Sequence, residues 1–147
     1  MEKIKTDLTV GACIVNESKV LLVLHAKLNK WLFPGGHIEN NETPDEAVIR
    51  EVKEETGLSL KLLDYGKILE TPDVIKRLAI PFYSNLHSVG DHNHYCAFYL
   101  GNVENNKIIK NIESKEIKWF SLEEIERLDN VPKNVKLMAA FGVEKVK

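Results

Sequence analysis

The sequence predicts an α/β fold in which helices cover a mixed β-sheet. Stretches typical of strands outnumber stretches typical of helices along the 147 residues, and the helical stretches fall in the middle and at the end. Hydrophobic residues make up 44% of the chain, which is enough apolar material for one core. We therefore expect a single domain over residues 1–147, with helices packed on the sheet.

The amino-terminal third predicts strands followed by a turn. Residues 8–15 and 20–25 are rich in Val, Leu and Ile and are separated by a polar turn. The first of these stretches is short and contains small residues, which favours a strand over a signal segment. Residues 31–33 are a shorter strand candidate. Residues 34–36 predict a turn, because their two glycines permit backbone angles or close approaches that side chains forbid.

The best-defined helix is expected over residues 44–56, and both of its ends are visible in the sequence. Thr43 and Glu46 form a capping-box pattern, and Pro44 suits the first helical position. Gly57 suits the carboxyl-terminal cap. The expected inner face consists of Ala47, Val48, Ile49 and Val52.

The second half of the chain predicts more strands and two further helices. Ser121 opens a capped helix that ends near residue 128, and another helix is expected over residues 132–141. The expected strands lie within residues 58–69, 78–83, 95–103 and 116–120.

The charge and the cysteines exclude several classes of protein. The formal net charge is -2, from 20 basic and 22 acidic residues, so the chain lacks the positive field that binds polymeric nucleic acid. No apolar run approaches the length of about 18 residues that a membrane span needs. Cys13 and Cys96 lie inside apolar runs, which suits free thiols in a reducing compartment and indicates a cytoplasmic protein.

Acidic residues are concentrated around the predicted helix. Residues 39–55 contain seven acids against two bases, a local charge of -5. Glu51, Glu54 and Glu55 are spaced i, i+3 and i+4, so their carboxylates share one face and repel one another. Such a cluster is either a solvated surface or a cation site, because Mg²⁺ binds carboxylates together with substrate phosphate oxygens. The seven acids are Glu39, Glu42, Asp45, Glu46, Glu51, Glu54 and Glu55.

The same residues form a recognisable motif. Gly36 is followed after five residues by Glu42, and after seven more residues by residues 50–58 (Arg-Glu-Val-Lys-Glu-Glu-Thr-Gly-Leu). The motif resembles the complete signature of the Nudix hydrolases. Nine constrained positions match such a signature by chance in about one of ten million chains. Residues 31–36 and 117–125 also resemble this family. The resemblance implies an α/β/α sandwich in which the signature forms a loop, a helix and a loop at the active site.

The resemblance also implies roles for individual residues. Glu51, Glu54 and Glu55 are expected to hold Mg²⁺, with Mn²⁺ as a substitute, and the backbone carbonyl near Gly36 completes the site. Arg50 is expected to orient a carboxylate, either that of Glu51 or that of Glu42. Glu42 itself either lies near the metal through water or pairs with Arg50. Val52 and Leu58 should be core residues.

The resemblance leaves the general base open between Glu51 and an acid outside the signature. Glu116 precedes the strand that contains Trp119, a region that supplies a carboxylate in some relatives, but here Lys118 directly precedes the tryptophan. The outside candidates are Asp91, Glu104, Glu113 and Glu116.

The implied reaction is hydrolysis of a phosphoanhydride bond in a small nucleotide. A nucleoside triphosphate, an oxidised one included, is the leading substrate, and an ADP-sugar is the alternative. Specificity is expected in residues 71–95, which contain Lys76, Arg77 and Pro81. Two other classes stay open, a non-catalytic nucleotide-binding regulator and an isomerase of isopentenyl diphosphate. The protein is expected to be a monomer or a homodimer.

Some remaining residues have a functional and a structural interpretation. His92, His94 and Cys96 alternate on a predicted strand and could bind zinc, but they lack a fourth partner. His37 either faces the phosphates or is a solvent-exposed turn residue. The aromatic candidates for stacking on a base, most of which must be core residues, are Trp31, Phe33, Phe82, Tyr83, Tyr95, Phe98 and Tyr99.

Overall fold

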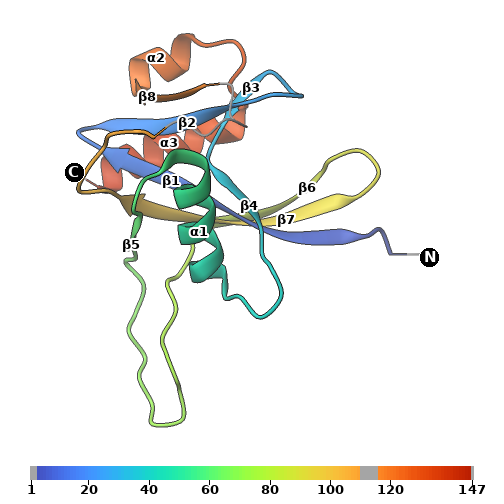
Figure 1. The fold of residues 1–147 in the computed structure, drawn as a ribbon, viewed down its shortest axis with the longest axis vertical. Helices are drawn as coiled ribbons and strands as arrows, with labels where there is room; N and C mark the ends of the chain where they lie inside the picture. The colour runs from blue at the N-terminus through green and yellow to red at the C-terminus, as the bar shows by residue number, and fades with distance from the viewer. Residues whose placement is uncertain (1–2, 110–115, 147) are drawn as a thin grey trace.

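The computed structural model describes residues 3–109 and 116–146, and within these ranges the chain forms eight strands and three helices (Figure 1). The amino-terminal half contains β1 (Thr6–Asn16), β2 (Lys19–His25), β3 (Lys30–Leu32), β4 (Gly35–His37) and α1 (Pro44–Thr56). The carboxyl-terminal half contains β5 (Lys61–Leu63), β6 (Tyr83–Ser88), β7 (Asn93–Asn102), β8 (Ile117–Ser121), α2 (Leu122–Arg127) and α3 (Lys133–Lys145).

The strand β1 connects the two halves of the sheet. Its main part pairs in parallel with β7, from Thr6 opposite Asn93 to Ile14 opposite Gly101. Its end pairs antiparallel with β2, and β4 pairs antiparallel with its middle. The central order is β3-β2-β1-β7-β5, while β8 pairs with β2 and β6 with β7. The sheet is therefore mixed, as the sequence predicts.

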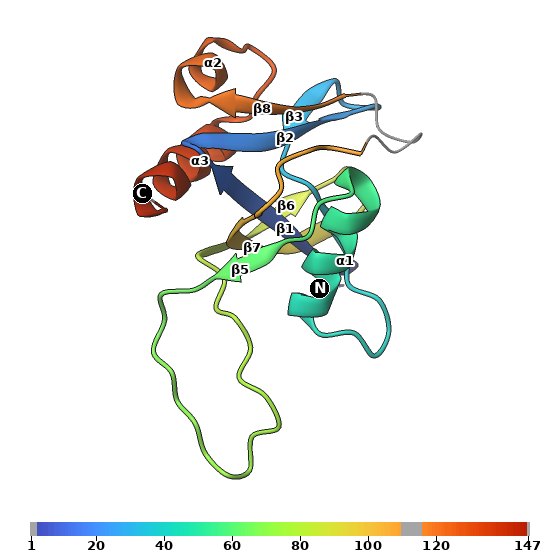
Figure 2. The same cartoon turned by 60° about the vertical axis from the view of Figure 1, so that its left-hand side comes forward.

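Helices pack on both faces of this sheet (Figures 1 and 2). Side chains alternate along a strand, so neighbouring residues of β1 face opposite layers. Cys13 and Val15 pack in one cluster with residues of α3, whereas Ala12 and Ile14 pack in another with residues of α1. The predicted α/β/α sandwich is confirmed. None of the helices in residues 3–109 and 116–146 is long and apolar enough to cross a membrane.

The predicted turn at residues 34–36 is wrong, because residues from Gly35 onward form β4. Gly35 pairs with Gly11 of β1 at such close range that a Cβ atom would lie 2.1 Å from the carbonyl oxygen of Val10. Gly35 is therefore needed for the close approach of two backbones, and neither glycine has an unusual backbone angle.

The predicted strand at residues 78–83 is also wrong, since β6 begins at Tyr83 and a long projecting loop precedes it (Figure 2). The carboxylate of Asp64 organises this loop by accepting hydrogen bonds from Arg77 and from the amides of Gly66 and Ile80. These amides bond to a side chain instead of to a neighbouring strand, which the sequence pattern does not reveal.

The helices begin where the sequence predicts, but one predicted inner-face residue and one predicted helix end differ from the structure. The capping box of Thr43 and Glu46 is present, and Gly57 caps α1 in the left-handed conformation. Val52 and Leu58 are buried as expected, but Ile49 is 41% exposed. The last helix, α3, continues to Lys145 instead of ending near residue 141.

Candidate active site

The middle and end of α1 place the predicted glutamates beside β4. A Cβ atom on Gly36 would lie 2.5 Å from the carboxylate carbon of Glu51, so this carboxylate packs directly on the glycine backbone. The amide of Gly35 donates a hydrogen bond to Oε1 of Glu55 at 3.4 Å. The two glycines of β4 thus contact two of the three predicted ligands, Glu51 and Glu55.

Arg50 is the centre of the ion-pair network in this site. Its Nε and Nη2 atoms donate to the two carboxylate oxygens of Glu42, at 2.6 and 2.9 Å. Its Nη1 atom donates to Glu51 at 2.9 Å and to Glu54 at 3.2 Å, while Nη2 also donates to the carbonyl of His37 at 3.0 Å. Of the two alternatives for Glu42, the structure shows the pairing with Arg50.

The electrostatics of the carboxylates differ according to their contacts. Hydrogen bonding to Arg50, and then to the amide of Glu39, lowers the pKa of Glu42 to about 2. Burial, together with the negative charges of Glu51 and Glu54, raises the pKa of Glu55 to about 7, although the hydrogen bond from the amide of Gly35 opposes the shift. Burial also raises the pKa of Glu51, although Arg50 opposes the shift. A single guanidinium therefore does not neutralise this group of acids.

These donors fit a hard divalent cation. Mg²⁺ takes carboxylate and carbonyl oxygens, which are the groups that Glu51, Glu54, Glu55 and the backbone at Gly36 offer. In the part of the chain that the structure describes, Glu55 forms no ion pair with a basic side chain. A bound cation would reverse the electrostatic cost of ionising it.

The acids proposed outside the signature are exposed or pair with a basic side chain. Glu116 is half exposed, and its carboxylate lies 3.6 Å from the ammonium group of Lys118. Asp91 pairs with His92, and Glu104 is exposed. Glu113 lies outside the described residues.

The two basic residues of the loop that precedes β6 have different surroundings. Arg77 pairs with Asp64 and donates to the carbonyl of Lys67, so its guanidinium is held within the loop. Lys76 is exposed, and its charge adds to the hydrogen bonds with the amide and hydroxyl of Thr43 that lower the pKa of Glu46 in the first turn of α1. The amide of Ala79 donates to Oδ2 of Asp45, which fastens the loop to the amino end of α1.

The zinc hypothesis for His92, His94 and Cys96 is wrong in its third member. Cys96 is buried in the core and is 6% exposed. His94 instead lies near Asp7 of β1 and His37 of β4, neither of which belongs to the predicted group. Their sequence separation hides this contact, because it depends on the pairing of β1 with β4 and β7.

Most of the aromatic candidates are core residues, as expected. Trp31, Phe33, Phe98 and Tyr99 are at most 9% exposed, whereas Tyr83 is 43% and Tyr95 is 38% exposed. Phe82 stacks on Phe141 of α3 beside an apolar cavity of about 250 Å³. This cavity is lined by Phe82, Tyr83, Asn134, Leu137, Met138 and Phe141.

Comparison with known proteins gives consistent matches along the chain. The family model described as NUDIX domain matches residues 5–141. The crystal structure of a hydrolase of the NUDIX family from Clostridium perfringens is 34% identical, with a TM-score of 0.84, and the match covers 96% of this chain and 98% of that one.

Two curated relatives differ in how much of their length is matched. The protein named "Probable DHNTP pyrophosphohydrolase" from Lactococcus lactis is 30% identical over 136 residues, which are 91% of this chain and 73% of the relative. The protein named "Putative nudix hydrolase 1" from Caenorhabditis elegans is 46% identical over 52 residues. That second match spans 33% of this chain but only 14% of the relative.

Proposed function

The chain belongs to the Nudix hydrolase family, and from this membership we propose that it hydrolyses a phosphoanhydride bond of a small nucleotide in the presence of Mg²⁺. The prediction of a Nudix-type pyrophosphohydrolase is confirmed at the level of the family. The metal, the substrate and the roles of the individual residues are parts of the proposal.

The observation that carries the proposal is the packing of two signature carboxylates on the glycines of β4. Glu51 lies against Gly36, and Glu55 accepts a hydrogen bond from Gly35. Burial holds the pKa of Glu55 at about 7, so this arrangement is electrostatically unfavourable for the protein alone. A site that gathers negative charge in this way is suited to a substrate whose phosphates arrive with cations.

Mg²⁺ would be held by Glu51, Glu54, Glu55 and the carbonyl at Gly36, with Mn²⁺ as a substitute. When bound, it supplies neutralisation of phosphate charge and a lower pKa for water. Arg50 keeps the Glu51 and Glu54 carboxylates in place, and Glu42 in turn fixes the plane of the guanidinium. Arg50 is therefore a positioning residue in this proposal.

For the proton acceptor, the geometry supports Glu51 better than Glu116. Glu51 lies inside the carboxylate group, and its raised pKa is closer to the value that suits a base near neutral pH. Glu116 is half exposed and lies beside Lys118.

A nucleoside triphosphate, including an oxidised one, is the leading substrate, and an ADP-sugar is the alternative. The loop that precedes β6 is fastened to Asp45, six to ten residues before the metal-site glutamates. At 1.5 Å per residue, this separation is about 9–15 Å along the helix. The loop, with the exposed Lys76, is therefore placed to contact the part of a substrate that lies beyond its reacting phosphate.

The proposal includes a cytoplasmic location and a small-molecule partner. Cys13 and Cys96 are free and buried, which supports a reducing compartment. The formal net charge of -2 supports a small nucleotide over polymeric nucleic acid.

Phosphorus NMR with a panel of substrates tests the function. The panel contains normal and oxidised nucleoside triphosphates, ADP-sugars, dinucleoside polyphosphates and an oligoribonucleotide with a 5′-triphosphate, each with Mg²⁺ and with a chelator. We expect cleavage of one class that requires Mg²⁺ and is lost in Glu55→Gln but retained in Glu144→Gln, a change of an exposed acid on α3. Binding of nucleotides without cleavage of any compound would contradict the proposal and indicate a regulatory domain.

A further inference from the structure

Three of the chain's five histidines, His37, His92 and His94, lie around Asp7 at one end of the sheet, and a fourth, His87, lies beside His94. His94 of β7 lies directly opposite Asp7 of the parallel β1 and opposite His87 of the antiparallel β6. His37 of β4 pairs with Thr9, two residues along β1 from Asp7 and on the same face. The ring centres of His37 and His92 each lie 5.1 Å from that of His94.

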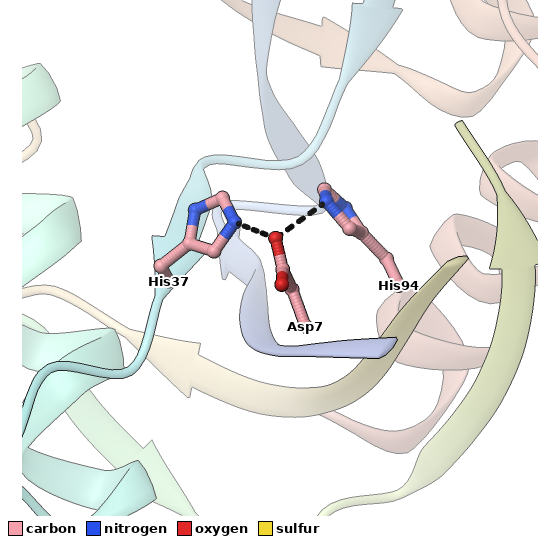
Figure 3. Close-up of side chains that lie close together, drawn as sticks. All are labelled: Asp7, His37 and His94. Atoms are coloured by element: carbon pink, nitrogen blue, oxygen red, sulfur yellow. Dashed lines mark hydrogen bonds and ion pairs between the residues drawn. The ribbon is translucent and has the colours of Figure 1, made fainter. Parts of the chain in front are cut away.

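Three of these side chains direct one potential ligand atom each toward a common point (Figure 3). The Oδ2 atom of Asp7 lies 3.0 Å from Nε2 of His37 and 3.8 Å from Nε2 of His94. All three ligand atoms lie within 4.8 Å of one another. They come from three different strands, so their convergence is a property of the folded sheet.

We propose that Asp7, His37 and His94 bind one divalent transition-metal ion, of which Zn²⁺ is the best match, and that the ion fastens β4, β1 and β7 to one another. A tetrahedral Zn²⁺ with bonds of about 2.0–2.1 Å holds its ligand atoms about 3.3 Å apart. The Oδ2 atom of Asp7 lies 3.0 Å from Nε2 of His37 and 3.8 Å from Nε2 of His94, on either side of this value, so rotations of the three side chains, of which that of His37 is exposed, complete the site.

Hydrogen bonding alone accounts for the cluster poorly. The same oxygen of Asp7 faces three imidazole nitrogens, since Nε2 of His92 also lies 3.3 Å away. The nearest ammonium group, that of Lys5, lies 3.7 Å from the other carboxylate oxygen and is largely exposed.

The surroundings of the cluster also resemble those of metal ligands. The Nδ1 atom of His92 lies 2.7 Å from a carboxylate oxygen of Asp91, which orients the opposite nitrogen toward Asp7. Carboxylates commonly orient metal-binding imidazoles in this way. His92, whose Nε2 atom lies 3.3 Å from Oδ2 of Asp7, is a further imidazole beside the proposed site.

This site is distinct from the glutamates of α1. Gly36 faces Glu51, and the next side chain along β4, that of His37, points to the opposite face of the sheet. The chemistry also differs, because imidazole suits Zn²⁺ and related ions whereas an all-oxygen set suits Mg²⁺. His37 connects the two places, since its carbonyl accepts a hydrogen bond from Arg50.

Titration of the untagged protein with Zn²⁺ tests the proposal. Calorimetry is performed with Mg²⁺ in large excess, so that the glutamates of α1 are occupied by the hard ion. We expect one Zn²⁺ per chain, a rise in Tm on binding, and the visible absorption of tetrahedral Co²⁺ when that ion is used instead.

Substitutions then assign the ligands. Loss of a partner that orients a metal ligand weakens metal binding by roughly 10- to 100-fold. Loss of a direct ligand should weaken it more, so we expect a larger fall in Zn²⁺ affinity in both His94→Gln and Asp7→Asn. His25→Gln is the matched control. His25 lies at the end of β2, outside the cluster, and accepts a hydrogen bond from the amide of Leu28. Glu55→Gln controls for binding at the other site.

Three outcomes would overturn the proposal. The first is the absence of stoichiometric Zn²⁺ binding to the wild-type protein. The second is equal Zn²⁺ affinity in His94→Gln and His25→Gln. The third is loss of Zn²⁺ binding in Glu55→Gln, which would place the ion on α1. The Tm of each metal-free variant shows whether the fold is intact, and His37→Gln provides a further test if one variant fails to fold.

Discussion

The guanidinium of Arg50 and the carboxylate of Glu42 form a bidentate ion pair, with Nε 2.6 Å from one oxygen and Nη2 2.9 Å from the other. The pair connects the loop before α1 to the helix itself. Since the remaining nitrogen, Nη1, contacts Glu51 and Glu54, the position of the candidate ligands depends on this contact.

Arg50→Lys should lower kcat by about 100-fold with little change in Tm. Lysine keeps the positive charge, but one ammonium group cannot reproduce the planar fork that contacts Glu42, Glu51 and the carbonyl of His37 together. A displacement of about 1 Å at a reacting group costs a factor of this size. Steady-state kinetics on the substrate identified by NMR is the measurement.

Lys53→Arg, the reverse exchange on the same helix, is the matched control, because the ammonium group of Lys53 contacts only the carbonyl of Gly57 among the described hydrogen bonds. Equal kcat values for Arg50→Lys and Lys53→Arg would contradict the positioning role.

Glu54→Gln and Glu55→Gln should each fold normally and lose turnover by at least about 100-fold at saturating Mg²⁺. Removing the charge of Glu55 relieves burial of an ionised group, so the metal-free variant should be at least as stable as the wild type. Thermal unfolding in chelator and kinetics in Mg²⁺ measure the two effects. Unchanged turnover in both variants would contradict the assignment of the metal site to α1.

Gly36→Ala should lower turnover by displacing Glu51. The added Cβ would lie 2.5 Å from the Glu51 carboxylate, which must then move away from β4. Because this side chain is only partly buried, it can rotate outward without unfolding the protein. We expect a raised Mg²⁺ requirement and a fall of about 10- to 100-fold in kcat, with far-ultraviolet circular dichroism unchanged. Normal kinetics would show that this contact has no functional part.

Asp64→Asn should destabilise the protein near neutral pH but not in strong acid. Burial opposes ionisation of Asp64, yet the amide of Gly66, the guanidinium of Arg77 and the amide of Ile80 together hold its pKa below the usual 3.8. The stabilisation from its charge is therefore complete above about pH 4 and is lost as the pH falls through the lower, folded-state value. At pH 7 the cost of leaving Arg77 without its charged partner is about 1–3 kcal/mol.

Urea unfolding at pH 7 and pH 3 measures this difference, and Asp129→Asn, a change of an exposed acid, is the control. A deficit in Asp64→Asn that is as large at pH 3 as at pH 7 would contradict the assigned ionic contribution.

Both thiols should be unreactive in the folded protein. Burial raises the pKa of Cys13 to about 12 and that of Cys96 to about 11. The thiolate is the reactive species, so labelling by a disulfide reagent at pH 8 should be about 100-fold slower than in denaturant, where two thiols per chain should react. Rapid native labelling of one thiol would show that its burial is incomplete in solution.

The sequence predicts α1 well because the signals for that helix are local. The capping box, the proline at the first position and the glycine after the last turn all lie within a few residues of the ends they determine. The same helix carries all three predicted carboxylate ligands, so most of the candidate metal site could be assembled without knowledge of the tertiary fold.

The parts that sequence reasoning missed depend on distant contacts. The role of Gly35 in β4 follows from a strand more than twenty residues earlier, and the Asp7, His37 and His94 group requires three strands to be in register. The apolar residues of the loop before β6 match the pattern of a strand, whereas the amides of Gly66 and Ile80 in this loop donate hydrogen bonds to the side chain of Asp64. Ile49 lies at the edge of the apolar face of α1, where periodicity alone does not determine exposure.

The parallel pairing of β1 with β7 has a consequence for how the protein is made. Partners in this ladder are 87 positions apart in the sequence, as Thr6 and Asn93 are. At a synthesis rate of about 5–20 residues per second, β1 waits on the order of 4–17 s for its neighbour to be added to the chain. During that interval Val10, Ala12 and Ile14 lack the cover of β7, although α1, which packs on the same side chains, is added to the chain earlier. The growing chain is then most exposed to chaperones and to aggregation, and the strand that later joins both halves of the sheet is among the last to be fully enclosed.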